Sequence, residues 1–559
     1  MAQTIPAHFF GQNAWYTRYT NDGQATNTND HFSTNITEVK NASPYFIRIG
    51  GANANILGND PGHPLTASEA LFLIKKIRDQ GLEPIVQVPY LNEDNANSQS
   101  VLTDWADKAK KMVDTINNIK VNEIPIGPLG TRKVTYWIIA NEPDKHLSGT
   151  KKIGYNYNQN DTSSPGKIAK YIKQFAIKMR EADPDIKIMG PELSWYIHHF
   201  YFGGSYGGKT FKGMLVDNSP NDITGLIGAT DVFGSATATS VRYKPYIDYV
   251  TFHWYTPSDS IQKVINELHS EADNWKFKKG LINLKNAVNS SSLATKRTTG
   301  PTTFPLKVAV TEANTQESTT YNPSTFLAGQ WWADFASVCL SQEVDMIQYW
   351  SSAENSFGFM NNSGTKRSSY HHFKQMSTNF KGTYYTGTDN KTNIKAFGSR
   401  GSNQIAVMIL NQDTAVNKPY TIRLDSTQPA TATWIKMNMD NAITTAYTDT
   451  IIASSTTLLI FDCAGNIVKK YRYEKADLNN PFKQIWHRGS YSIADQFAFN
   501  NYPSAVYYNI DIGTISSSIS VNTLGPHLFE SANDITVRGE FIVPLGETLT
   551  LFPTSGDCD

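Results

Sequence analysis

The chain has 559 residues, more than one ordinary domain holds, so two or three domains are expected. Its 50 basic and 50 acidic side chains cancel, which argues against a nucleic-acid or membrane-surface partner, because both favour a basic excess. The sequence contains no run of about eighteen apolar residues, so no membrane span is predicted. Aromatic residues make up 12 % of the chain, which suits either a densely packed core or ligands with flat stacking faces, such as sugar rings.

The first ten residues, MAQTIPAHFF, have neither a charged segment nor the long apolar stretch of a secretory signal. We interpret them as an initiator methionine in front of a mature chain from which an export signal was removed. Together with the Asn-, Thr- and Ser-rich composition, this predicts a secreted or cell-surface protein. The three cysteines, Cys339, Cys463 and Cys558, are too few for a disulfide framework and match no zinc spacing, so no metal site is expected.

Up to about residue 380, short apolar runs rich in β-branched and aromatic residues alternate with helical patterns. The eight runs span residues 9–15, 45–51, 84–90, 134–143, 186–195, 249–255, 307–314 and 346–352. Helices are predicted between them, for example at 67–81, 101–116 and 166–182, and a C-cap glycine ends the first. Eight buried runs, each followed by a helix or a long loop, are the number in a (β/α)8 TIM barrel, an α/β fold. A doubly wound open sheet is the alternative with the same periodicity.

Helical patterns fade after about residue 382, and strand-like runs separated by turn residues follow. An antiparallel β-sandwich is predicted over 382–472. Residues 473–559 are again strand-like and punctuated by Ser and Gly, which indicates a small β-rich module or an extension of the sandwich. The predicted barrel domain therefore comprises 1–381.

The ends of the barrel strands are where catalytic residues are expected, because the C-terminal ends of all eight strands face one shared mouth. The polar and aromatic residues at these ends are Arg48, Asn92, Asn141, Glu142, Glu192, His253, Tyr255, Glu312, Asn314 and Trp350. Two carboxylates end similar strands, Glu142 in IIANEP on the fourth run and Glu312 in VAVTEAN on the seventh. A carboxylate at the end of an apolar strand is costly unless something uses it, so these two are the candidate catalytic pair.

The arrangement resembles the clan A glycoside hydrolases, which are (β/α)8 enzymes that cleave glycosidic bonds with net retention. The resemblance is carried by Asn141–Pro143 on strand four and Thr311–Glu312 on strand seven, with FIRIGG, FHWY and QYW on strands two, six and eight. It covers roughly residues 8–470, since several of these families carry a β-sandwich after the barrel. RIGG is similar to the β-glucuronidase, xylosidase and arabinofuranosidase branches and FHWY to the endoglucanase branches, so the clan is identified and the family is not.

The resemblance implies that Glu142 is the general acid/base and Glu312 the nucleophile. Retention needs the two carboxyl groups about 5–5.5 Å apart. At that distance both do not ionise comfortably, so one keeps its proton near neutral pH. The resemblance further implies that Asn141 binds the 2-hydroxyl of the cleaved sugar and that Arg48 keeps Glu312 ionised. A turn-forming Asn and a structural salt bridge are the alternatives for these two residues.

Other residues complete the predicted substrate site. His253 and Tyr255 lie two apart on one strand and hence on one face, where they would bind a hydroxyl or orient the nucleophile. A satisfied core histidine is the alternative for His253. Trp350 would form the stacking floor of the cleavage subsite. The remaining candidates are Trp195, for which plain packing is the alternative, and the strand-end polar residues Asn92 and Glu192.

The sequence thus predicts a secreted retaining hydrolase that cleaves β-glycosidic bonds of a polysaccharide or oligosaccharide and needs no cofactor. Many aromatic and few basic residues at the strand ends favour an endo-β-glucanase. The alternatives are an exo-acting β-glycosidase of the xylosidase, glucuronidase or arabinofuranosidase type and a transglycosylase. A non-catalytic carbohydrate-binding protein is the rival from another class, and an open-sheet enzyme would hold Glu142 and Glu312 far apart.

Overall fold

The computed structural model describes most of the chain as two compact units. One unit comprises Pro6–Thr378, and the other comprises Met1–Ile5 together with Asn379–Asp559. The described residues are 3–14, 31–51, 65–88, 99–144, 167–196, 198–206, 209–217, 219–232, 234–256, 260–316, 322–387, 393–425, 434–441, 446–463, 465 and 467–487, and the short strands of 491–553.

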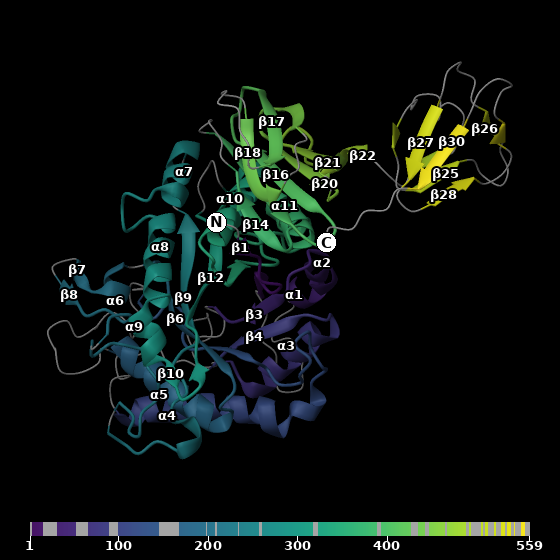
Figure 1. Ribbon diagram of the computed structural model, residues 1–559. Coiled ribbons are helices and arrows are strands. Elements are labelled where there is room, and N and C mark those ends of the chain that lie inside the picture. The colour runs from purple at the N-terminus through teal and green to yellow at the C-terminus, as the bar shows by residue number, and fades with distance from the viewer. Residues whose placement is uncertain are drawn as a thin grey trace. The chain divides into compact units, whose positions relative to one another are not determined.

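Eight parallel strands of the first unit close into a barrel (Figure 1), in the order β12-β13-β2-β3-β4-β5-β6-β9. Their bounds are β2 (Phe10–Ala14), β3 (Phe46–Ile49), β4 (Glu83–Gln87), β5 (Tyr136–Ile138), β6 (Lys187–Leu193), β9 (Tyr249–Thr256), β12 (Lys307–Thr315) and β13 (Met346–Tyr349). These are the eight predicted runs, in the same order along the chain. The closed barrel is therefore confirmed, and the alternative of an open doubly wound sheet is wrong.

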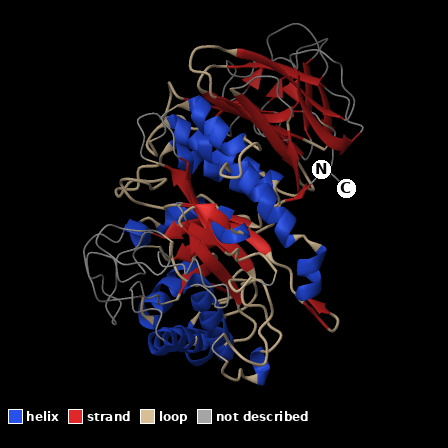
Figure 2. Cartoon of the chain, turned by 90° about the vertical axis from the view of Figure 1, so that its left-hand side faces the viewer, coloured by secondary structure: helices blue, strands red, loops and turns tan. Residues whose placement is uncertain are grey.

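Helices lie around the outside of the barrel strands (Figure 2). Within the described residues they are α1 (His31–Thr34), α2 (Ile36–Asn41), α3 (Ala67–Asp79), α4 (Gln99–Asp114), α5 (Lys167–Ala182), α6 (His198–Phe202), α7 (Ile261–His269), α8 (Phe277–Val288), α9 (Ser291–Lys296), α10 (Phe326–Ser341) and α11 (Ser368–Asn379). The three helices predicted by residue number correspond to α3, α4 and α5. A capping box between Thr66 and Glu69 begins α3, and Gly81, with φ +73°, follows its end.

The two ends of the barrel interior differ in chemistry. Apolar side chains from the first residues of several strands, among them Phe46, Tyr136, Tyr249 and Met346, form one buried cluster. Further along the same strands the buried side chains are polar. Because the strands are parallel, all of these polar side chains gather at the C-terminal end of the barrel. The barrel interior is therefore apolar at the N-terminal ends of the strands and polar at their C-terminal ends, which form the mouth.

The second unit contains an antiparallel sheet, as was expected after the barrel, and a smaller sheet that mixes parallel and antiparallel pairs. A seven-stranded sheet has the order β1-β14-β15-β16-β20-β21-β22, and a three-stranded sheet has the order β18-β17-β19. Their bounds are β1 (Gln3–Thr4), β14 (Thr383–Thr386), β15 (Ile394–Arg400), β16 (Ile405–Asn411), β17 (Lys418–Asp425), β18 (Trp434–Asn441), β19 (Ala446–Ile451), β20 (Ser455–Phe461), β21 (Ile467–Glu474) and β22 (Lys483–His487). One hydrophobic cluster joins the sheets, with Val407 and Leu459 from the first and Ile422 and Ile451 from the second.

The remaining strands are short. Two hairpins in the first unit pair β7 (Gly204–Tyr206) with β8 (Lys209–Phe211) and β10 (Thr298–Thr299) with β11 (Thr302–Thr303). After residue 487 the strands are β23 (Tyr491–Ile493), β24 (Ala505–Val506), β25 (Asn509–Ile512), β26 (Ile519–Ser520), β27 (His527–Ser531), β28 (Asp534–Val537), β29 (Phe541–Ile542) and β30 (Leu549–Pro553). They pair in parallel into sheets of two or three strands. The C-terminal segment is thus β-rich, as expected.

Two further features bear on the setting of the chain. Cys463 is disulfide-bonded, whereas Cys339 in α10 is a buried free thiol and Cys558 lies outside the described residues. Burial raises the pKa of the Cys339 thiol well above its ordinary value, so this thiol stays protonated.

None of the helices in the described part of the chain has both the length and the apolar character to cross a membrane.

Candidate active site

Glu142 lies on a strained turn just after β5. Ala140 has φ +76° and Glu142 has φ +49°, both in the left-handed region that non-glycine residues rarely occupy. Each such residue costs on the order of 1–3 kcal/mol and persists only where its surroundings hold it in place. One such restraint is the backbone N–H of Glu142, which donates to the carbonyl oxygen of Glu192 at 2.8 Å. The end of β6 therefore fixes where the Glu142 carboxyl group lies.

Glu312 lies on β12, and both of its carboxylate oxygens accept hydrogen bonds from fixed donors. Nη1 of Arg48 donates to Oε1 at 2.7 Å, and the hydroxyl of Tyr255 donates to Oε2 at 3.0 Å. Arg48 is completely buried. Burial alone would lower its pKa, but the charges of Glu192 and Glu312 outweigh burial and raise it. Arg48 therefore stays cationic and holds Glu312 in place through a charge-assisted hydrogen bond.

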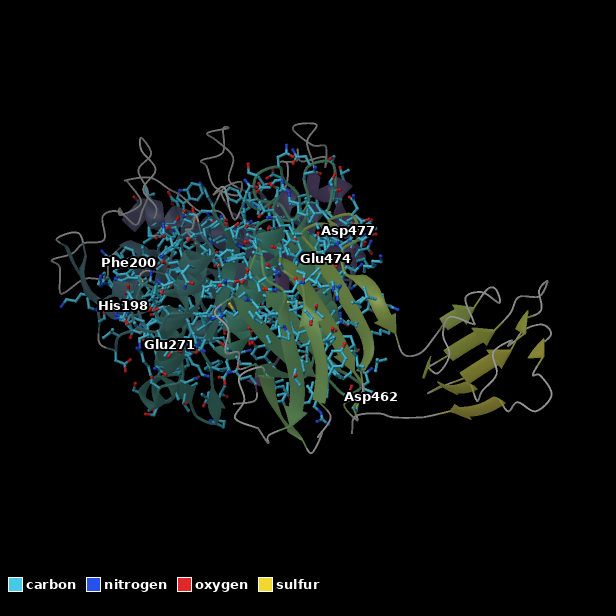
Figure 3. The ribbon with its side chains drawn as sticks, turned by 90° about the horizontal axis from the view of Figure 1, so that it is seen from above. His198, Phe200, Glu271, Asp462, Glu474 and Asp477 are labelled. Carbon is cyan, nitrogen blue, oxygen red and sulfur yellow. The ribbon has the colours of Figure 1, made fainter. Side chains whose placement is uncertain are left out.

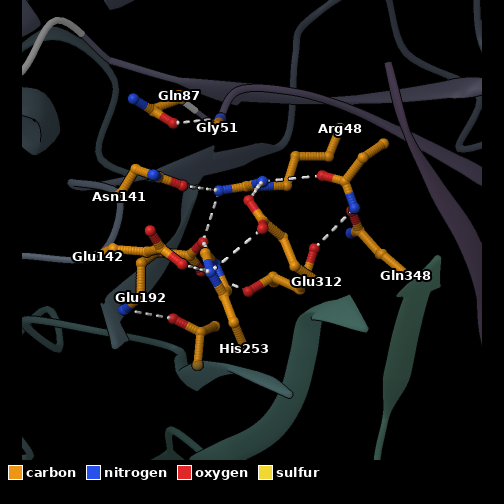
Figure 4. Close-up of polar contacts among 12 residues, drawn as sticks. Arg48, Gly51, Gln87, Asn141, Glu142, Glu192, His253, Glu312 and Gln348 are labelled. Carbon is orange, nitrogen blue, oxygen red and sulfur yellow. Dashed lines mark hydrogen bonds and ion pairs between the residues drawn. The ribbon is translucent and has the colours of Figure 1, made fainter. Parts of the chain in front are cut away.

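The guanidinium group of Arg48 also organises the neighbouring strands (Figure 4). Nη1 donates to Oδ1 of Asn13 at 2.8 Å, while Nη2 donates to Oδ1 of Asn141 at 2.9 Å and to Oε2 of Glu192 at 2.8 Å. Glu192 is fully buried, and its other oxygen accepts from the hydroxyl of Thr311 at 2.8 Å. Both oxygens of Glu192 thus accept hydrogen bonds from protein donors, and one of these bonds holds the Arg48 guanidinium group in place.

His253 lies between three carboxyl groups. Its Nδ1 is 3.2 Å from Oε1 of Glu142 and 3.3 Å from Oε2 of Glu312. Its Nε2 is 3.1 Å from Oε2 of Glu192. Burial lowers the pKa of the imidazole, but the three carboxylates together outweigh burial and raise it to about 9. At neutral pH the ring is therefore an imidazolium that donates a proton from each nitrogen.

The charges of Arg48, His253 and the three carboxyl groups balance when one carboxyl group keeps its proton. Arg48 and His253 contribute two positive charges, and the carboxyl groups of Glu142, Glu192 and Glu312 contribute at most three negative ones. A net charge in a buried site is costly, so one carboxyl group is expected to keep its proton. Arg48 forms ion pairs with Glu192 and Glu312 and lowers the pKa of Glu192 against the opposing effect of burial. Glu142 is the remaining carboxyl group and the best placed to hold the proton.

The separation of the two candidate catalytic carboxylates is short. One side-chain atom each from Glu142, His253 and Glu312 lies within 4.8 Å of the other two. Such close oxygens are compatible with a retaining pair, whose carboxyl groups lie about 5–5.5 Å apart, and favour it over an inverting pair at roughly 6.5–9.5 Å, which must leave room for a water. Two carboxylates and an imidazole also have the donor chemistry of a metal site. Here the hydrogen bonds and ion pairs among these three groups already account for how they are held together.

Trp350 and Gly51 pack closely beside Glu312. Gly51 has φ +85°, and its N–H donates to Oε1 of Gln87 at 2.9 Å. A Cβ atom on Gly51 would lie 2.4 Å from Cη2 of Trp350 and 3.5 Å from Oε1 of Glu312. Only glycine therefore allows the indole ring to approach this closely, and the ring lies near Glu312, where the sequence predicts a stacking floor.

The other predicted residues are not all brought together. Asn92 lies outside the described residues. The ring of Trp195 packs against that of Trp254 in a tilted arrangement, with centroids 4.3 Å apart. Trp254 alternates with His253 and Tyr255 along β9, so Trp195 lies on the helix-facing side of that strand. Asn314 donates from Nδ2 to the carbonyl oxygens of Trp350 and Phe357, which anchors the loop after β13.

Several residues of the site were not selected from the sequence. Asn13 receives the Arg48 hydrogen bond and donates from Nδ2 to the carbonyl oxygens of Thr311 and Tyr349, at 2.9 and 3.2 Å. It lies at the end of the first strand, so the strand-end rule would have found it. Gly51 shows no sequence signal beyond the RIGG motif. Asp144 follows Pro143, and its hydrogen-bond partner, Ser194, is known only from the structure.

Comparisons with known proteins support the fold. No family model and no curated protein sequence matches the chain. Among solved structures it is similar to the α-L-arabinofuranosidase from Thermotoga maritima in its arabinose complex, with 14 % identity, TM-score 0.52, and 82 % of this chain and 97 % of that chain covered.

Two further solved structures are similar over the same share of the chain. The thermostable GH51 α-L-arabinofuranosidase from Thermotoga petrophila RKU-1 has 13 % identity and TM-score 0.51, with 82 % of this chain and 98 % of that chain covered. CelM2, a bifunctional glucanase-xylanase from a metagenome library, has 16 % identity and TM-score 0.51, with 82 % and 97 % covered. At this identity the likeness shows a shared fold, and it confirms the architecture that the clan A resemblance implies.

Proposed function

We propose that this chain is a retaining glycoside hydrolase in which Glu142 is the general acid/base and Glu312 the nucleophile. The observation that carries the proposal is the approach of the two side chains within 4.8 Å at the mouth of a closed barrel. A second observation distinguishes their roles. Arg48 and Tyr255 each donate to one oxygen of Glu312, so both oxygens act as acceptors, as in an attacking carboxylate, and the charge balance of the cluster favours a protonated Glu142.

The geometry supports a two-step displacement. In the first step a carboxylate oxygen of Glu312 forms a bond to the anomeric carbon, the glycosidic C–O bond breaks, and the proton of Glu142 passes to the departing oxygen. In the second step Glu142, now ionised, takes a proton from a water molecule. The water oxygen bonds to the anomeric carbon, the bond to Glu312 breaks, and the configuration of the sugar is retained.

Three neighbouring residues support this chemistry. Because Oδ1 of Asn141 accepts from Arg48, the amide nitrogen is the group of this residue that would donate to a sugar 2-hydroxyl. Such a bond strengthens as charge develops on the ring. The imidazolium of His253 lies between Glu142 and Glu312 and would stabilise the Glu142 carboxylate after it has given its proton to the leaving group, while Glu312 is bonded to the sugar. Trp350 would stack on the sugar beside the nucleophile.

For the substrate we propose a β-linked, uncharged polysaccharide, cleaved internally as by an endo-β-glucanase. Support comes from the aromatic-rich composition and from the pairing of both site cations, since Arg48 and His253 contact carboxylates and offer no free charge to a uronic acid. We also propose that the protein is secreted. The disulfide bond of Cys463 supports this, because disulfides persist in oxidising compartments.

The direct test is a pair of conservative variants assayed on a panel of polysaccharides and aryl glycosides. Glu142→Gln and Glu312→Gln should each lose at least about a hundredfold in kcat while keeping the wild-type thermal transition. Glu271→Gln is the matched control, because Glu271 is exposed and lies at the edge of the barrel domain (Figure 3). It should retain wild-type kcat/KM.

The stereochemistry and the products complete this test. The first product seen by proton NMR should have the anomeric configuration of the substrate. A rapid fall in polymer viscosity would support internal cleavage, whereas release of single sugars would favour the exo-acting alternative. Hydrolysis at the wild-type rate by either glutamine variant would contradict the assignment.

A further inference from the structure

A second acidic residue contacts the turn that carries Glu142. The turn contains two non-glycine residues in the left-handed region, Ala140 and Glu142, so its conformation needs external support. The hydrogen bond from the N–H of Glu142 to the carbonyl oxygen of Glu192 supplies one restraint before Pro143. Asp144 supplies another restraint on the far side of the proline.

The carboxylate of Asp144 accepts two hydrogen bonds from one residue. The backbone N–H of Ser194 donates to Oδ1 and its hydroxyl donates to Oδ2, each at 2.8 Å. Ser194 directly follows Leu193, the last residue of β6. The turn after β5 is therefore fastened to the end of the next barrel strand on both sides of Pro143. We call the contact between Asp144 and Ser194 the turn clip.

We propose that Asp144 is a positioning residue for Glu142, whose turn clip fixes the acid/base turn and whose negative charge favours the protonated form of the Glu142 carboxyl group. This inference rests on the proposed function, because it gives Asp144 a role only if Glu142 is the acid. It adds a residue outside the pair of catalytic glutamates and a physical reason why one of two nearby carboxyl groups keeps its proton.

The charge of Asp144 acts on Glu142 because the two groups are electrostatically coupled. Burial raises the pKa of Asp144 to about 6; the two hydrogen bonds from Ser194 oppose this rise, and the charge of Glu142 adds to it. Coupling between two sites is reciprocal, so the anion of Asp144 must raise the proton affinity of Glu142 by the same amount. The effect develops as Asp144 ionises around pH 6 and is nearly complete about one pH unit above that value.

Other charged and titratable groups face this pair and set the background. They are Arg48 on β3, Glu192 on β6, Tyr201 on α6, His253 and Tyr255 on β9, and Glu312 on β12. The two cations favour the ionised form of Glu142, whereas the carboxylates favour its protonated form. The negative charge of Asp144 therefore favours the protonated form of Glu142 and opposes the effect of Arg48 and His253.

The test compares Asp144→Asn with wild type in the pH profile of kcat/KM. Asparagine keeps the size and an acceptor for the N–H of Ser194 but removes the charge, so the alkaline limb, which reports loss of the acid's proton, should move to lower pH by roughly half a unit or more. At neutral pH the loss should be about tenfold for a substrate with a poor leaving group. It should be smaller for an aryl glycoside whose leaving group departs without a proton.

Ser194→Ala provides the matched variant, because it removes one hydrogen bond of the turn clip and keeps the charge. It should lower kcat for the substrate with a poor leaving group and leave the alkaline limb in place. An alkaline limb that does not move in Asp144→Asn, or equal losses on both substrates, would overturn the charge effect. A wild-type kcat in Ser194→Ala would overturn the clip.

The role of Asp144 and the proposed function can be refuted separately. If Glu142→Gln is inactive on unactivated substrates and Asp144→Asn behaves as wild type, only the role of Asp144 is refuted. If Glu142→Gln is fully active, the proposed function itself is refuted. Thermal transitions of all variants identify any loss that comes from unfolding.

Discussion

Replacing Gly51 with alanine tests the packing of Trp350, the proposed stacking floor for the sugar. The new Cβ would lie 2.4 Å from Cη2 and 2.6 Å from Cζ3 of Trp350, whereas carbon atoms in contact prefer about 3.5–4.0 Å. The indole ring would therefore have to move by about 1 Å or more. Because Gly51 has φ +85°, alanine also adds about 1–2 kcal/mol of backbone strain.

The expected result separates these two effects. A displacement of about 1 Å in a substrate-contacting group costs on the order of a hundredfold in rate, so kcat/KM should fall by roughly that factor. The strain alone should lower the unfolding free energy by about 1–2 kcal/mol. Gly81→Ala is the control, because Gly81 has φ +73° and a Cβ atom added to it would meet nothing within 4 Å.

The assay is kcat/KM on the best substrate of the panel, together with urea unfolding of both variants. Gly81→Ala should show a similar loss of stability and wild-type kcat/KM. Wild-type activity in Gly51→Ala, or an equal loss of activity in both variants, would refute the placement of Trp350 beside the nucleophile.

Three further predictions concern protons and metals. The folded state keeps a proton on His253 up to about pH 9 that the unfolded chain loses near pH 6.5, so stability should fall as pH rises from 6.5 to 9, and His253→Gln should remove this slope in urea unfolding. Asp345 accepts from Tyr249, Lys307 and His8, and its pKa is lowered because His8 and Lys307 outweigh the effect of burial. Asp345→Asn should therefore cost about 2 kcal/mol at pH 7, and the difference from wild type should shrink below pH 3.8. Dialysis against a chelator should leave kcat unchanged, because two carboxyl groups suffice for the chemistry; a loss restored by a divalent cation would show that Glu142, His253 and Glu312 bind a metal.

The barrel was predictable because parallel strands buried on both faces are continuous apolar runs, and their C-terminal ends share one mouth. Glu142, Glu312 and Arg48 were therefore predictable as strand-end residues, and the structure brings them together. The position of a polar residue at a strand end does not show whether its side chain faces the substrate or another protein group. Glu192 ends a strand like the others, yet the fold buries it completely against Arg48 and His253.

The remaining details depend on contacts between residues that are distant in sequence. The closeness of Gly51 to Trp350 and of Asp144 to Ser194 follows from strand register and turn geometry, which composition and periodicity do not encode. Likewise, β1 (Gln3–Thr4) pairs with β14 (Thr383–Thr386), so the first residues group with the C-terminal unit, a pairing that a two-residue strand cannot signal by its pattern.

Trapping the covalent intermediate tests the central claim most directly. A 2-deoxy-2-fluoro glycoside with an activated leaving group slows both steps and should accumulate one glycosyl group per chain. Peptide mass mapping should place that group on Glu312 in the wild type, and Glu312→Gln should form no adduct. An adduct on another residue, or turnover of a matched substrate with inversion of configuration, would contradict the assignment of Glu312 as the nucleophile opposite Glu142.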